Sequence, residues 1–87
     1  MAPLGDTAAL YDWGERDDPG FRLWKRVADW IASELSERPW AAPSTPMIPT
    51  EGQPFEFRSA VVPGTDITVV YENNHETGRV DLLYVGS

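Results

Sequence analysis

The proline-rich segment 39–54 divides the 87-residue chain into two parts with different residue patterns. It carries most of the eight prolines, and each proline removes a backbone donor that a helix or a sheet would use. We therefore predict an extended connector over 39–54 that contains neither helix nor strand. The part before it should be helical and the part after it should be built of strands.

The connector has a period of its own. Pro43, Pro46 and Pro49 recur at every third residue, which is the repeat of a polyproline II ligand that a polyproline-recognising domain would bind. The interpretation that we favour is a strap lying over the domain. Its three large apolar side chains would then pack inward: Trp40, Met47 and Ile48.

Apolar residues before the connector recur at steps of three and four, which predicts one long helix over 19–37. The members of this stripe are Phe21, Trp24, Val27, Ala28, Ile31, Ala32 and Leu35. Asp18 is placed to cap the helix, with Pro19 in the first turn. Upstream, Asp6 as a cap and Gly14 as a stop predict a short helix over 6–13.

Three strands joined by tight turns are predicted for 55–85, at residues 55–62, 66–72 and 79–85. Pairing Val62 with Asp66 in the first hairpin puts both phenylalanines, Phe55 and Phe57, on the apolar face with Val61, Ile67, Val69, Tyr71, Val80, Leu82 and Tyr84. Pairing Glu72 with Arg79 closes the second hairpin. The open face then carries the mixed charges Glu56, Arg58, Glu72, Arg79 and Asp81.

These patterns together predict a single α+β domain over residues 1–87. Two helices, the second one long, pack on one face of a three-stranded antiparallel meander sheet, with the connector between them. The chain has room for one modest core and for no second domain.

Charge and composition narrow the function. Seven Lys and Arg against fourteen Asp and Glu give a net charge of −7, so nucleic acid is an unlikely partner and a basic protein is a suitable one. There is no cysteine, and His75 is the only histidine, so we expect no metal site. No cofactor motif occurs. No membrane span or signal sequence is evident, which predicts a cytoplasmic protein.

The order of short helix, long helix, loop and three antiparallel strands resembles the RelE/ParE superfamily of bacterial toxins. The segment "VPGTDITVVYENNHETGRVDLLYVG" carries the closest likeness, through Val69-Val70-Tyr71 and the alternating strand that ends in Tyr84-Val85. The resemblance covers roughly residues 17–85 and is one of hydrophobic pattern. The family's usual N-terminal strand is not expected here, because "MAPLG" has no strand pattern.

What the resemblance implies depends on the branch of the family. Its messenger-RNA-cleaving members use basic residues on the open sheet face and a catalytic tail after the last strand. This chain offers Arg58 and Tyr71 as weak catalytic candidates and ends at Gly86-Ser87, without such a tail. ParE-type members act by binding a protein. We therefore expect a toxin-like domain that binds a protein, with an antitoxin-like partner, or one that has lost its activity; an enzyme is not favoured.

Two alternatives stay open: a free-standing acidic protein-interaction module without toxin history, and a ribosome-dependent ribonuclease. The candidate partner-binding residues are Leu23, Trp30, Arg58 and Arg79. Leu23 and Trp30 lie on the edge of the long helix. The first helix would cover Trp30 through Leu10 and Trp13, or else Trp30 and Leu23 would hold a partner.

Overall fold

A computed structural model of the chain describes residues 4–38, 44–48, 55–74 and 76–87. It contains α1 (Ala8–Asp17), α2 (Phe21–Trp30), the π-helical segment η1 (Ile31–Leu35) and four strands. The strands are β1 (Ser44–Ile48), β2 (Phe55–Val61), β3 (Thr68–Asn74) and β4 (Arg79–Gly86). They form one antiparallel sheet in the order β1-β2-β3-β4. The predicted α+β class and the predicted meander of three strands, β2 to β4, are thus confirmed.

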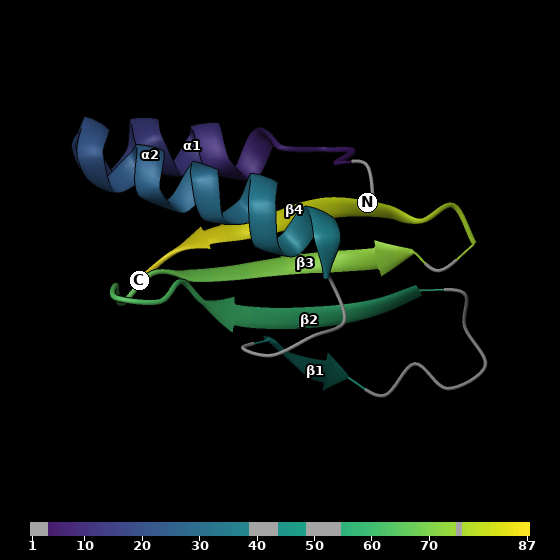
Figure 1. The fold of residues 1–87 in the computed structure, drawn as a ribbon. Helices are drawn as coiled ribbons and strands as arrows, with labels where there is room; N and C mark the ends of the chain where they lie inside the picture. Colours follow the sequence, from purple (N-terminus) through teal and green to yellow (C-terminus); the bar gives the residue numbers. More distant parts are fainter. Residues whose placement is uncertain (1–3, 39–43, 49–54, 75) are drawn as a thin grey trace.

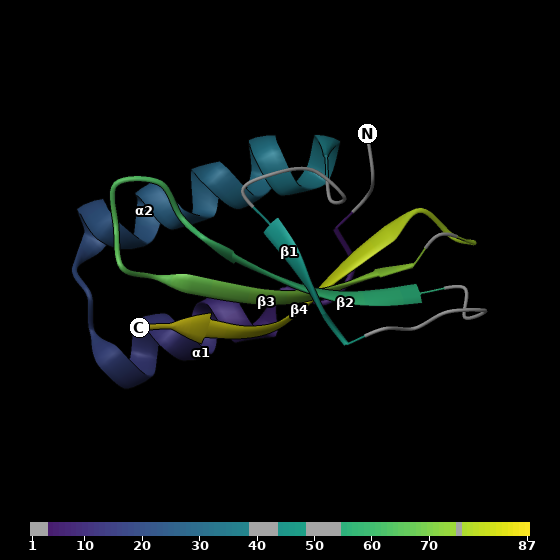
Figure 2. The same ribbon diagram turned by 90° about the horizontal axis from the view of Figure 1, so that it is seen from below.

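Both helices lie on the β4 side of the sheet, and β1 forms the opposite edge (Figure 1). Seen from below, α2 runs as a layer beside the sheet, and β1 crosses in front of β2 (Figure 2). Within the part of the chain that the structure describes, no helix has both the length and the apolar character needed to cross a membrane. Residues 39–43 and 49–54 of the predicted connector, Trp40 among them, lie outside the described residues, as do His75 and the side chains of Met47 and Ile48.

Helix α1 begins and ends later than the predicted helix over 6–13. Asp6 still acts at its start, because its Oδ1 accepts a hydrogen bond of 2.9 Å from the backbone N–H of Ala8. The helix continues through Gly14 to Asp17 and ends at Asp18, whose φ of 47° is left-handed. Gly14 is not a stop. A Cβ there would lie 2.9 Å from Trp24 Cδ1, so the glycine allows α1 and α2 to approach closely.

The predicted long regular helix over 19–37 is replaced by two pieces. Helix α2 begins at Phe21, because Asp18 and Gly20 both take positive φ in the reversal between the helices, and it has ten residues, as α1 does. The π-helical segment η1 follows it directly. Four residues of regular helix overshoot a full turn by about 40°, and the wider turn of η1 offsets this drift. Val27, Ile31 and Leu35 all remain buried as a result.

Strand β1 contradicts the prediction that the connector would contain no strand. Ser44–Ile48 pairs with β2, and Pro46 lies opposite Arg58. A proline is tolerated there because β1 is an edge strand, where a missing N–H can face away from the ladder. The pairing shifts between Pro46 and Ile48, so the ladder is irregular next to the proline.

The first hairpin pairs one residue away from the predicted register. Val61 lies opposite Thr68, and the N–H of Val62 donates to the carbonyl of Ile67 over 2.9 Å, so the loop is Pro63–Asp66. A slip of one residue exchanges the faces of a strand. The face of β2 that joins the core therefore carries Arg58 and Ala60. Phe55, Phe57 and Val61 lie on the other face, and Val61 is exposed.

The register of the second hairpin differs from the predicted one by two residues, so near the turn each side chain stays on its predicted face. Glu72 lies opposite Asp81 rather than Arg79, and Val80 and Leu82 are buried as predicted. A bulge between Val70 and Tyr71 then shifts the register. Tyr84 is turned outward, with 41% of its surface exposed, and Val85 is buried in its place.

The N-terminal segment covers the outer edge of β4. Leu4 forms a parallel bridge with Val80, and the N–H of Leu82 donates to the carbonyl of Asp6 over 2.8 Å. Farther along the same edge, Arg16 of α1 donates from Nη2 to the carbonyl of Val85 over 2.9 Å, and its guanidinium lies 5.6 Å from the centre of the Tyr84 ring. A hydrogen bond with Asp17 raises the pKa of Arg16.

One core joins the helices to the sheet. Its buried side chains come from both helices, from η1 and from β2 to β4 with the β2–β3 loop. They are Leu10, Trp13, Val27, Ile31, Leu35, Ala60, Val62, Ile67, Val69, Tyr71, Val80, Leu82 and Val85.

Candidate partner-binding site

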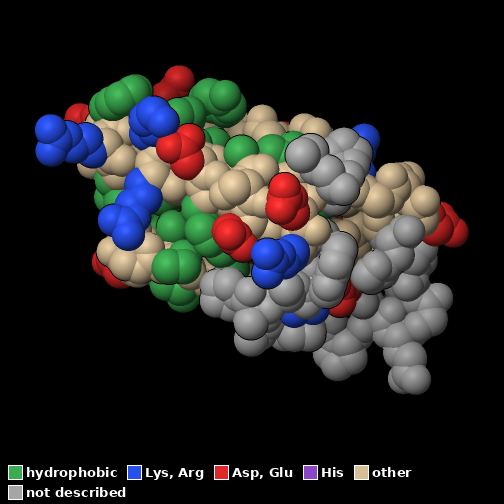
Figure 3. Space-filling view, in the orientation of Figure 1, with side chains coloured by type: hydrophobic (Ala, Val, Ile, Leu, Met, Phe, Trp, Pro, Cys, Tyr) green, Lys and Arg blue, Asp and Glu red, His purple; other side chains and the backbone are tan. Residues whose placement is uncertain are grey.

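The exposed side of α2 follows from the residues that it buries. Because Val27 faces the core, the positions on the opposite side of the helix face solvent. Five residues of α2 border a shallow, open hollow of about 450 Å³. We call them the basic helix surface: Phe21, Arg22, Lys25, Arg26 and Asp29. Figure 3 shows Lys and Arg side chains gathered over the part of the molecule where α2 begins.

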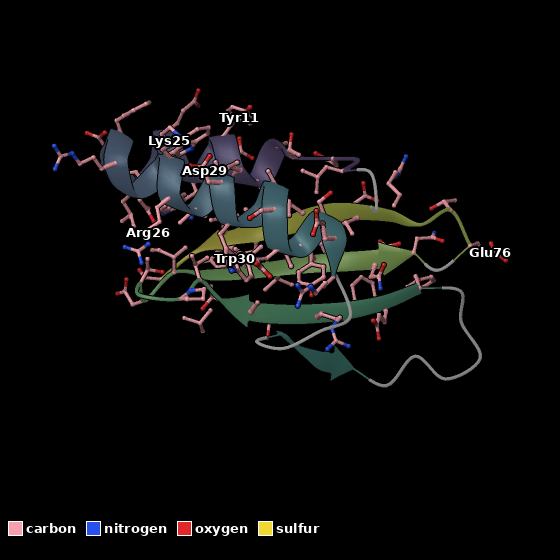
Figure 4. All side chains as sticks on the ribbon, viewed as in Figure 1. Tyr11, Lys25, Arg26, Asp29, Trp30 and Glu76 are labelled. Atoms are coloured by element: carbon pink, nitrogen blue, oxygen red, sulfur yellow. The ribbon has the colours of Figure 1, made fainter. Side chains whose placement is uncertain are left out.

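The cations of the basic helix surface have weak local partners. Lys25 Nζ lies 2.9 Å from Asp29 Oδ2, and both side chains are more than half exposed. Arg26 Nη2 donates to the backbone carbonyl of Pro63 over 3.2 Å, which leaves its charge uncompensated. Arg22 has no ion pair or side-chain hydrogen bond with any described residue. In Figure 4, Lys25 and Asp29 lie on one side of α2 near Tyr11, and Arg26 lies on the side toward the sheet.

Two aromatic side chains stand exposed on the helical layer. Phe21 is 74% exposed and Tyr11, on α1, is 58% exposed. The Tyr11 ring lies 5.5 Å from that of Trp24, whose Nε1 donates to the carbonyl of Leu10 over 3.2 Å. Phe21 was predicted to belong to the buried stripe, and this is wrong because its stripe position falls in the first turn, beyond the reach of the sheet.

The two weak catalytic candidates are brought together, but inside the protein. Arg58 lies opposite Tyr71 on neighbouring strands; Arg58 is 7% exposed and Tyr71 is fully buried. Arg58 Nη1 donates to Glu56 Oε1 over 3.3 Å, and Asn73 Nδ2 donates to the same oxygen over 3.3 Å. The predicted place of Arg58, on the open face of the sheet, is corrected by the one-residue slip of β2. Its burial and its carboxylate partner suit a structural role.

The other predicted binding residues are dispersed. Leu23 and Trp30 are partly buried and pack against the core, and Trp30 points toward the sheet (Figure 4). Arg79 is exposed on β4, where its Nη2 lies 3.2 Å from Asp81 Oδ2. These residues do not form one surface with Arg58. Sequence reasoning missed Phe21, Tyr11 and the basic helix surface; the signal that could have found them is three cations in the first two turns of one helix.

The described side chains hold no group of three or more His, Cys, Asp and Glu that could bind a metal ion. The candidate site therefore offers charge, hydrogen-bond donors and apolar surface. No family model matches the chain, and no curated protein or solved structure matches it either.

Proposed function

We propose that this domain acts by binding a protein partner through its helical layer, as a toxin-like domain of the RelE/ParE type with an antitoxin-like partner. The observation that carries the proposal is the exposure of Phe21 and Tyr11 beside the cations of α2. Aromatic and arginine side chains are enriched at protein interfaces and among the residues that contribute most of the binding energy, where they lie in well-packed, desolvated pockets.

The burial of Arg58 favours binding over RNA cleavage. A cation that stabilises phosphate in a transition state must reach the phosphate from the protein surface. Arg58 is held in the interior by Glu56 instead, and its strand neighbour Tyr71 is buried beside it. The ribonuclease alternative thus lacks an accessible cation at its two candidate residues.

Induced expression in bacteria tests the proposal. We expect growth arrest with intact messenger RNA, and we expect Phe21→Ser to relieve the arrest at an equal level of soluble protein, because it removes exposed apolar surface and leaves the core untouched. Val61→Ser, at an apolar site on the sheet that is also exposed, is the control and should leave the arrest unchanged. Cleavage of messenger RNA on induction, or arrest that Phe21→Ser does not affect, would contradict the proposal.

A free-standing protein-interaction module is the second candidate, and the burial of both Arg58 and Tyr71 favours it too. It shares the helical binding surface with the first candidate and differs in having no effect on growth. Normal growth at high soluble expression would select this alternative.

A further inference from the structure

The cations of α2 lie near its N-terminus, where a positive charge does not stabilise a helix. The N-terminus of a helix carries a partial positive charge, so acidic side chains stabilise it and basic ones destabilise it. The first turn of α2 has no acidic residue, although the chain has fourteen of them. Arg22, Lys25 and Arg26 occupy the first two turns instead. Helix stability does not explain this arrangement.

The rest of the fold does not explain it either. Arg22 lacks a partner in the described part of the chain, and an exposed ion pair such as that of Lys25 with Asp29 contributes little to stability. Among the described residues, Arg26 is hydrogen-bonded to the neutral carbonyl of Pro63 and to no carboxylate. Three cations and one anion leave the basic helix surface with a net charge of +2, on a chain whose formal net charge is −7. The patch thus has a charge opposite to that of the molecule.

The chemistry of the occupant follows from the lining of the hollow. Carboxylates would pair with Arg22, Lys25 and Arg26, and arginine is suited to holding a carboxylate with two parallel hydrogen bonds. Phe21 borders the same hollow and would pack against an apolar side chain of the occupant. We infer that the basic helix surface binds an acidic segment of a partner protein that also carries an apolar side chain. This inference rests on the proposed function, whose partner it specifies.

A nucleic acid is a poorer occupant for the same surface. Binding to a phosphate backbone draws on many phosphate contacts along an extended positive surface. Here the positive surface is limited to three cations with Asp29 among them, and the rest of the chain would repel a long polyanion. A short acidic segment can remain within the patch.

Selection from a phage-displayed library of random peptides against the purified domain tests the inference. We expect the selected peptides to be rich in Asp and Glu with a large apolar residue, and to bind more weakly as salt is raised. Arg22→Glu should weaken the selected peptides at least tenfold in fluorescence anisotropy. The substitution leaves the fold intact, because Arg22 has no partner to lose and an acidic residue favours the start of a helix.

Arg38→Glu is the matched control. It makes the same change of charge near the other end of the helical segment, about 24 Å from Arg22 by the rise of a helix, which exceeds the screening length at physiological salt. Binding should be unchanged by it. Selected peptides that are neutral or basic, or that bind Arg22→Glu as tightly as the unaltered domain, would overturn the inference and leave the proposed function standing. Failure to select any peptide would overturn both the inference and the proposed function. Displacement of the selected peptides by a single-stranded oligonucleotide would show that a nucleic acid, not a protein, binds this surface.

Discussion

At the scale of single residues, Arg58 and Arg79 make the same ion pair in two environments. Each is bonded to a carboxylate two positions away on its own strand, Glu56 and Asp81 respectively, at 3.3 and 3.2 Å. The Arg58 pair is largely buried, whereas Arg79 is exposed. Removing one partner of a buried pair leaves the other charge without compensation, but an exposed partner is replaced by water.

Arg58→Met is therefore expected to lower the free energy of unfolding by about 3 kcal/mol, and Arg79→Met by less than about 1 kcal/mol. Urea denaturation followed by tryptophan fluorescence measures both. Equal losses for the two variants would show that the Arg58 pair is not buried in solution.

Gly14 is the second residue whose role is steric. A helical glycine normally gains about 1 kcal/mol of stability on replacement by alanine. Here the added Cβ would overlap the indole of Trp24, which its hydrogen bond to Leu10 holds in place. We expect Gly14→Ala to lower the free energy of unfolding by about 1–2 kcal/mol, since overpacking outweighs the gain in helix propensity. Glu15→Ala, one residue along on the exposed side, is the control and should be close to neutral; a more stable Gly14→Ala would contradict the close approach of the helices.

At the scale of elements, the register of the first hairpin decides which face of β2 joins the core. Ser59 lies opposite Val70 in the structure, whereas the predicted register would place it opposite Val69. Residues directly opposite each other are close enough for a disulfide, and the chain has no cysteine of its own. Under mild oxidation we expect Ser59→Cys with Val70→Cys to cross-link, and Ser59→Cys with Val69→Cys to stay reduced. The reverse result by thiol titration would restore the predicted register.

The same hairpin shows what local sequence could and could not predict. The alternation in β3 and β4 identified Val69, Tyr71, Val80 and Leu82 as core residues, because the opposite faces of these strands carry mostly polar side chains. In β2 both faces carry apolar residues, so the pattern allowed two registers of β2 against β3. The β2–β3 loop, Pro63–Asp66, is one residue longer than predicted, and the register that goes with it buries Arg58. The edge strand that contains Pro46 was missed for a related reason. Proline is excluded from a central strand but tolerated in an edge strand, and the local sequence does not show which position a strand takes in the sheet.

The exposure of Phe21 was not predicted, because helical spacing alone does not determine it. Helical spacing correctly placed Val27, Ile31 and Leu35 toward the core, and it placed Phe21 there too. Whether the first turn of a helix is covered depends on how far the sheet extends beneath it, and spacing carries no information about that.

At the scale of the whole molecule, the positive patch and the most exposed aromatic side chains lie on the same side, that of the helices. The helices lie together beside β4, and they carry the basic helix surface and the two most exposed aromatic side chains of the described residues, Phe21 and Tyr11, whereas Arg58 is enclosed by the fold. A local positive patch on an acidic domain would steer an acidic segment to one orientation before contact. The central claim is therefore that partners bind to the helices rather than to the sheet.

The most direct test is a map of backbone amide chemical shifts as a selected acidic peptide is added to the labelled domain. The largest changes are predicted for residues 21–29 of α2 and for Tyr11, with little change on β2 and β3. Shifts concentrated on the face of the sheet that carries Phe57 and Val70 would contradict the claim and move the binding site to the sheet.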